Sequence, residues 1–250
     1  MLAINWDERL YPENLAGLLI ACKSERKLRL LACALIRHMP YHPDGRTIWD
    51  LLPESEWFEH QYYKTERPNL HEVIAVIERY ADGHATVSEW EVACGRSYEA
   101  VRVAMGVTPL CSYEPSPDCW FVYLPILMIY VATEHRPSEL ARWMFCFRDK
   151  FPDEYRVDLH PNNGVSICSL IRDSLMGPER RRPIRPEWLT EPVKGLAAEA
   201  YENHRFDILP ILGTTLEKAG CSDQAMLRHC REPGLHARGC WVLDRVLGFQ

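Results

Sequence analysis

The N-terminal part of the chain carries hydrophobic residues at intervals of three and four positions, the spacing that forms one face of an α-helix. This pattern predicts helices over residues 13–22, 27–37 and 70–81. Ser24 is placed to cap the second of these helices, and Gly83 follows the end of the third. This part of the chain is therefore expected to form short amphipathic helices joined by turns.

Two further helix signals come next. Thr86 and Glu89 have the spacing of a capping box, which predicts a helix that begins there and runs through Ala93. Ser97 is placed to start a separate short helix that runs to Met105. These signals predict two short elements in this segment.

The middle region, residues 109–176, gives a weaker pattern. Its apolar run, residues 119–132, is only about 14 residues long and contains Pro125, whereas a membrane-spanning helix needs about 20. The run therefore predicts a buried core helix and no membrane span. Residues 101–107 and 120–123 also resemble strands, which leaves open a minor small sheet in the middle of the chain.

The C-terminal block, residues 187–250, has the clearest helical periodicity. It predicts amphipathic helices over residues 192–203 and 206–219 and a short helix over residues 223–230. After a Pro-Gly turn, a last helix is expected over residues 236–247.

These elements predict a mainly α fold, an irregular multi-helical bundle. The regions expected are an N-terminal helical region (1–108), the middle apolar helical region (109–176), an arginine-rich linker (177–186) and the C-terminal helical block (187–250). A typical domain holds roughly 100–200 residues, so a chain of 250 residues also allows one compact domain.

Composition indicates where such a protein is found. The ten cysteines sit inside apolar runs, as in residues 31–35, where a reduced cysteine behaves as a small buried hydrophobe. Residues 1–8 contain charges and no apolar core of a signal peptide. The sequence therefore predicts a cytoplasmic protein with reduced cysteines.

Charge bears on the class of partner. The net charge of −6 disfavours non-specific binding to nucleic acids, which depends on many contacts from lysine and arginine. The linker nevertheless contains Arg180, Arg181, Arg182 and Arg185, and guanidinium groups match the geometry of phosphate. A phosphate or nucleic-acid site is one hypothesis for this run, and a solvated linker is the other.

The residues most suited to chemistry lie in the C-terminal block. Cys221, His229, His236 and Cys240 are ligands of the kind that zinc prefers, within about 20 residues. His236 and Cys240 would share a face if the last helix included both. The alternatives are a core filled by thiols and hydrogen-bonded histidines, or a catalytic Cys–His pair. No C-x-x-C knuckle is present.

Charged residues of the expected last helix have two interpretations. Arg238 and Asp244 either belong to a charged binding face or form ion pairs that hold the helix against the core. Trp241 is interpreted as a core anchor on the same helix.

The string His-Cys-Arg-Glu-Pro-Gly-Leu-His-Ala-Arg-Gly-Cys-Trp-Val-Leu-Asp-Arg-Val-Leu-Gly, at 229–248, resembles the C-terminal signature of an uncharacterised bacterial protein family. Residues 26–37 and 78–93 also resemble that family, as do residues 185–190, 200–212 and 216–221. The resemblance implies a helical cytoplasmic protein and implies no activity.

Three functional hypotheses follow. No P-loop, dinucleotide-binding, nucleophile-elbow or zinc-protease motif is present, which favours a non-enzymatic interaction or scaffold protein whose partner is another protein. The first alternative is a zinc-bearing protein or hydrolase that uses the C-terminal histidines and cysteines. The second is a nucleic-acid-associated protein that uses the arginine run.

Overall fold

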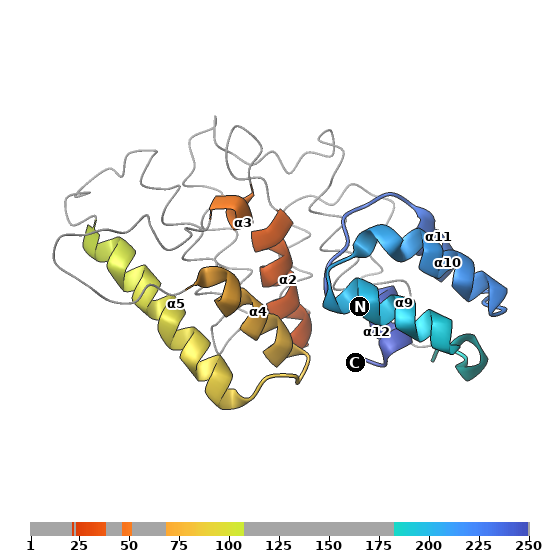
Figure 1. The fold of residues 1–250 in the computed structure, drawn as a ribbon, viewed down its shortest axis with the longest axis horizontal. Coiled ribbons are helices and arrows are strands. Elements are labelled where there is room, and N and C mark those ends of the chain that lie inside the picture. Colours follow the sequence, from red (N-terminus) through yellow and green to blue (C-terminus); the bar gives the residue numbers. More distant parts are fainter. Residues whose placement is uncertain (1–21, 23, 39–46, 52–68, 108–182, 250) are drawn as a thin grey trace. The chain divides into compact units, whose positions relative to one another are not determined.

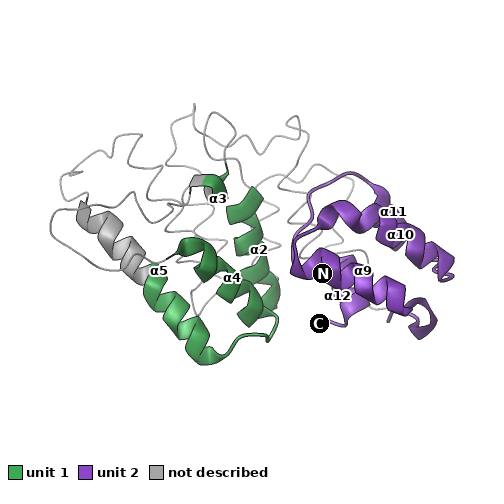
Figure 2. Ribbon diagram, in the orientation of Figure 1, with its two compact units in different colours: residues 1–158 green, residues 159–250 purple. Residues whose placement is uncertain are grey.

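A computed structural model describes the chain in two compact units, residues 1–158 and 159–250 (Figure 2). The residues described are 22, 24–38, 47–51, 69–107 and 183–249 (Figure 1). They form helices and contain no strand, which confirms the mainly α prediction. Residues 13–21 of the first expected helix, the expected middle region and residues 177–182 of the linker lie outside the described residues, so these elements and boundaries stay predictions. None of the described helices is long and apolar enough to cross a membrane.

Helix α2 (Glu25–His38) is largely buried, more so than the other described helices of the first unit. The hydroxyl of Ser24 accepts a hydrogen bond from the N–H of Lys27 at 3.3 Å, which confirms the predicted cap. All residues from 28 to 36 are buried, so the helix is covered on more than one side. It packs against α4 (Leu70–Ala81) and the short helix α3 (Ile48–Leu51).

Helix α4 follows the predicted pattern closely. The side chain of Asn69 accepts hydrogen bonds from the first backbone N–H groups of the helix. The helix ends at Ala81, and Gly83 adopts a left-handed φ of 76°, as a residue just past a helix end commonly does. One apolar stripe faces α2 and α5 (Val87–Val107); it consists of Leu70, Val73, Ile74 and Ile77, all buried.

The capping box at the start of α5 is confirmed. The N–H of Glu89 donates to the Thr86 hydroxyl at 3.2 Å, and the N–H of Thr86 donates to the Glu89 carboxylate at 2.8 Å. The hydrogen bonds from Thr86, backbone first, lower the pKa of Glu89 because they stabilise its charged form.

The prediction of a second, separate helix after this one is wrong. Helix α5 continues without a break from Val87 to Val107, so residues 101–107 are also not a strand. Ser97 does not begin a new element because its hydroxyl donates to the carbonyl of Cys94 at 2.8 Å, inside the helix. A serine bonded in this way remains compatible with a helix interior.

Two ion pairs connect α2 to α4 and its end. Arg37 donates to both carboxylate oxygens of Glu78, at 2.9 and 3.1 Å, and Arg26 pairs with Asp82 at 2.9 Å. The side chain of Glu78 is almost fully buried, with 4% exposed. These pairs set the position of one helix against the other, because a buried carboxylate requires its cation.

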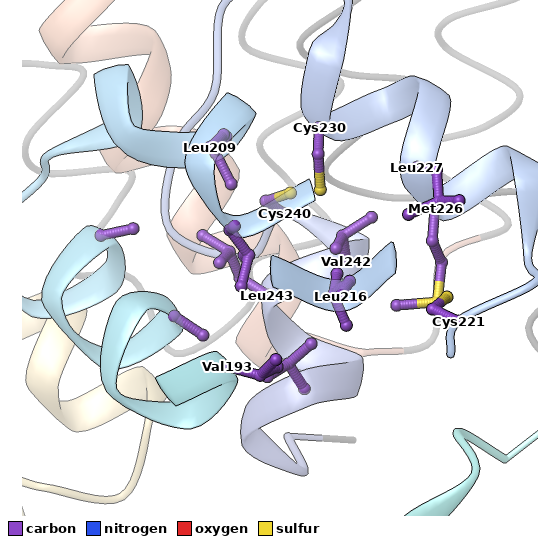
Figure 3. Close-up of a cluster of buried hydrophobic side chains, with 14 of the residues drawn as sticks. Val193, Leu209, Leu216, Cys221, Met226, Leu227, Cys230, Cys240, Val242 and Leu243 are labelled. Atoms are coloured by element: carbon purple, nitrogen blue, oxygen red, sulfur yellow. The ribbon is translucent and has the colours of Figure 1, made fainter. Parts of the chain in front are cut away.

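The described part of the second unit, residues 183–249, holds four α-helices around one core. They are α9 (Glu191–Glu202), α10 (Leu209–Lys218), α11 (Gln224–Arg231) and α12 (Trp241–Leu247), with 3-10 turns η3 (Pro186–Trp188) and η4 (Phe206–Ile208). Helix α9 packs against both α10 and α12, and α10 packs against α11. Figure 3 shows the core between them, in which Val193, Leu216, Met226, Val242 and Leu243 are buried.

The expected last helix begins later than predicted. Helix α12 starts at Trp241, so residues 236–240 are not part of it. Pro233 and Gly234 end the preceding helix, and Gly239 has a φ of 85°, which a right-handed helix does not allow. Gly248 then closes α12 with a left-handed φ of 82°.

Gly213 lets α10 approach α11 closely. A Cβ atom added there would lie 2.8 Å from the Cβ of Cys230, which has no freedom to move away. We expect Gly213→Ala to lower the free energy of unfolding by about 1–2 kcal/mol, because overpacking outweighs the better helix propensity of alanine. Chemical denaturation of the full chain measures this effect.

The matched control is Gly195→Ala in α9, where an added Cβ meets no atom within 4 Å. This variant is expected to gain about 0.5–1 kcal/mol of stability. Equal effects of the two substitutions would contradict the close contact between α10 and α11.

Candidate metal centre

Three potential metal ligands converge at the edge of the second unit. One ligand atom each from His229, His236 and Cys240 lies within 4.8 Å of the other two. His229 comes from the last turn of α11, His236 from the segment that follows, and Cys240 is the residue before α12. His236 and Cys240 do not share a helix, because α12 begins after both, yet the chain brings both to His229.

Local structure explains this convergence. Asp223 caps α11 by accepting hydrogen bonds from the N–H groups of Ala225 and Met226, at 3.1 and 3.2 Å. Its second oxygen pairs with Arg245 of α12 at 3.1 Å, which ties the start of α11 to the last helix. The turn before α12 is closed by the N–H of Cys240, which donates to a backbone carbonyl.

The geometry of the three side chains is compact. Nε2 of His229 lies 3.0 Å from Sγ of Cys240. The rings of His229 and His236 stand nearly perpendicular, at 83°, with centroids 4.8 Å apart. Both histidines are half-buried, Nδ1 of His236 is buried, and Cys240 is 2% exposed.

Trp241 adds a fourth member to the cluster. Its indole N–H donates to Nδ1 of His229 at 3.2 Å. The indole group only donates, so Nδ1 of His229 must offer a lone pair. In the neutral ring the proton is then on Nε2, the atom that faces the Cys240 sulfur. The sequence pattern did not indicate this role of Trp241, although a buried indole N–H usually has a partner.

The ligand set fits zinc in type and number. Two imidazoles and one thiolate are borderline and soft ligands, which suit zinc better than magnesium or calcium. Three protein ligands leave one position of a tetrahedral ion for water or another ligand. A nucleophilic role for Cys240 fits less well, because a sulfur that is almost fully buried does not reach an external substrate.

Cys221, which the sequence also nominated as a ligand, does not join this group. It belongs to the buried core cluster that also contains Met226, and Figure 3 labels both. Burial raises its pKa. Burial, followed by the charges of Cys240 and Cys221, also raises the pKa of Cys230 to about 12, so this thiol keeps its proton at neutral pH.

The arginine run falls mostly outside the described residues. This applies to Arg180, Arg181 and Arg182, so the phosphate hypothesis for them stays a prediction. Arg185 is described, and its guanidinium lies 5.4 Å from the ring centroid of Trp188.

The other two candidate binding residues, Arg238 and Asp244, both make contacts that hold the second unit together. Arg238 donates to the carbonyls of Tyr201 and Glu202, at 3.1 and 3.3 Å, and so satisfies the C-terminal end of α9. Asp244 is 4% exposed and is part of the buried side of α12. These contacts do not form an exposed charged face.

Comparison with known proteins adds no functional information. No match was found to a family model, to a curated protein or to a solved structure.

Proposed function

We propose that the C-terminal unit binds one zinc ion through His229, His236 and Cys240. The observation that carries this proposal is the convergence of their ligand atoms within 4.8 Å. The three residues come from separate places in the chain, so an ion between them would cross-link α11, the following segment and α12. Binding would stabilise the folded unit, because the unfolded chain does not present the three ligands together.

The proposed ion has a structural role in this arrangement. The segment between α11 and α12 contains two glycines and a proline and forms no helix. A metal ion held by His236 would fix this segment against the helix on either side. The fourth coordination position would remain available to water or to a further ligand.

The hypothesis of a protein-interaction scaffold stays a prediction, as does the cytoplasmic location. Large apolar side chains that are exposed within the described residues are Val87, Val92 and Ile211. Two of them lie on α5 and one on α10, and exposed apolar side chains in such small number are normal for a protein surface and identify no partner.

Metal analysis of the full chain, purified without chelators and then supplied with zinc, tests the proposal. We expect about one zinc per chain in the unaltered protein and a loss of that zinc in Cys240→Ala, because the thiolate is one of three ligands. Zinc at 100 times its dissociation constant should also stabilise the protein by about 2.7 kcal/mol.

Cys230→Ala is the matched control, since Cys230 is buried in the same core and lies outside the ligand group. It should retain the zinc. If the unaltered protein binds less than about 0.2 zinc per chain, the proposal is wrong. Cobalt substitution of the unaltered protein provides a second test, in which a sulfur-to-cobalt charge-transfer band is expected and its absence would exclude Cys240 as a ligand.

A further inference from the structure

We propose that Trp241 weakens the metal site by holding His229 in the tautomer that places a proton on the ligating nitrogen. This inference rests on the proposed zinc site. The indole N–H of Trp241 and Nδ1 of His229 are 3.2 Å apart, and their rings lie 5.2 Å from centroid to centroid. Trp241 is 8% exposed, so water does not readily replace this hydrogen bond.

Metal ligation requires the opposite arrangement of protons. Nε2 of His229 faces the Cys240 sulfur and is therefore the nitrogen that would bind zinc. It must offer its lone pair to the ion, so the proton of the neutral ring moves to Nδ1. The thiol of Cys240 releases its proton to solvent as the thiolate binds the ion.

The indole group opposes this rearrangement. A histidine that binds a metal normally donates its other N–H to a carboxylate, a carbonyl or water. Here the group opposite Nδ1 is itself a donor with no lone pair to offer. Two N–H groups would face each other, the hydrogen bond would be lost, and the buried indole N–H would remain without an acceptor.

The two states of the site therefore compete. Without metal, hydrogen bonds link Trp241 to His229 and His229 to Cys240 in one chain. With metal, the first of these bonds breaks. Zinc affinity is consequently lower than the three ligands alone would provide, and the metal-free unit has a stable arrangement of its own.

Replacing the indole tests this inference directly. Trp241→Phe keeps an aromatic ring in the core, removes the N–H donor and also removes part of the ring volume. We expect this variant of the full chain to bind zinc roughly tenfold more tightly, equivalent to about 1.4 kcal/mol, as measured by competition with a chromophoric chelator. A role for Trp241 in packing alone predicts the opposite sign, because a loosened site binds more weakly.

Trp188→Phe is the matched control. Trp188 belongs to the same core cluster, stacks with Arg185 and should show zinc affinity unchanged within about twofold. If the unaltered protein binds zinc and Trp241→Phe binds it equally or more weakly, the inference is wrong while the zinc site stands. If neither protein binds zinc, both proposals fail.

Proton nuclear magnetic resonance of the indole groups gives a second measurement. It uses the unaltered protein and therefore does not require a variant to fold. Zinc should move the indole proton signal of Trp241 upfield, as the hydrogen bond to His229 is lost, and leave that of Trp188 in place. A zinc-loaded protein in which the Trp241 signal does not move would overturn the inference.

Discussion

Trp241→Ala is expected to lower the free energy of unfolding by about 3–5 kcal/mol, the range for deletion of a large buried aromatic side chain. Trp241 is the first residue of α12 and is almost fully buried in the core of the second unit. Its ring also lies 5.2 Å from that of His229 and 5.8 Å from the Arg245 guanidinium. The substitution therefore leaves a cavity and removes the contact of the indole with His229 of α11.

Chemical denaturation of the full chain measures this loss. Ile211→Ala serves as the control, because this isoleucine of α10 is 55% exposed and should change stability by less than about 0.5 kcal/mol. A melting temperature of Trp241→Ala equal to that of the unaltered protein would mean that Trp241 is not part of the core.

Glu78→Gln is expected to destabilise the first unit by about 3 kcal/mol, the lower end of the range for breaking a buried ion pair. The glutamine amide would place a donor opposite the Arg37 donors, and the guanidinium would lose its counter-charge. The expected loss of stability is at the lower end of this range because the Arg37 side chain keeps other partners. It is 16% exposed to water, and its guanidinium lies 3.8 Å from the ring centroid of Trp49.

The same substitution at Glu72, on the same helix, is the control. Glu72 pairs with Arg96 at 3.5 Å, and both side chains are more than half exposed. An exposed pair of this kind contributes about 0–1 kcal/mol. If Glu78→Gln and Glu72→Gln have similar effects, the buried pair between α2 and α4 does not contribute as we describe.

Helix starts were predictable because capping is local. Ser24, Thr86 and Asp223 all accept hydrogen bonds from N–H groups two or three residues later, as their positions before apolar runs indicate. The buried stripe of α4 follows in the same way from spacing alone. Such features depend on residues within one turn of each other, which the linear pattern contains in full.

The length of a helix was harder to predict where one residue can take either of two local roles. Ser97 can start a helix or bond to the carbonyl of the preceding turn, and the helix continues because the second option occurs. The start of α12 was predicted too early, directly after the Pro-Gly turn, whereas Gly239 adopts a left-handed backbone conformation that delays the helix.

The amino-acid sequence by itself determined the helical class, the capping residues and the identity of the candidate ligands, since each depends on residue type and short spacing. Only the tertiary structure decided that His229, His236 and Cys240 meet while Cys221 remains in the core. It also decided that an indole donor faces His229. These contacts join different elements, and the direction of each side chain there depends on how α11 and α12 pack, which no local pattern encodes.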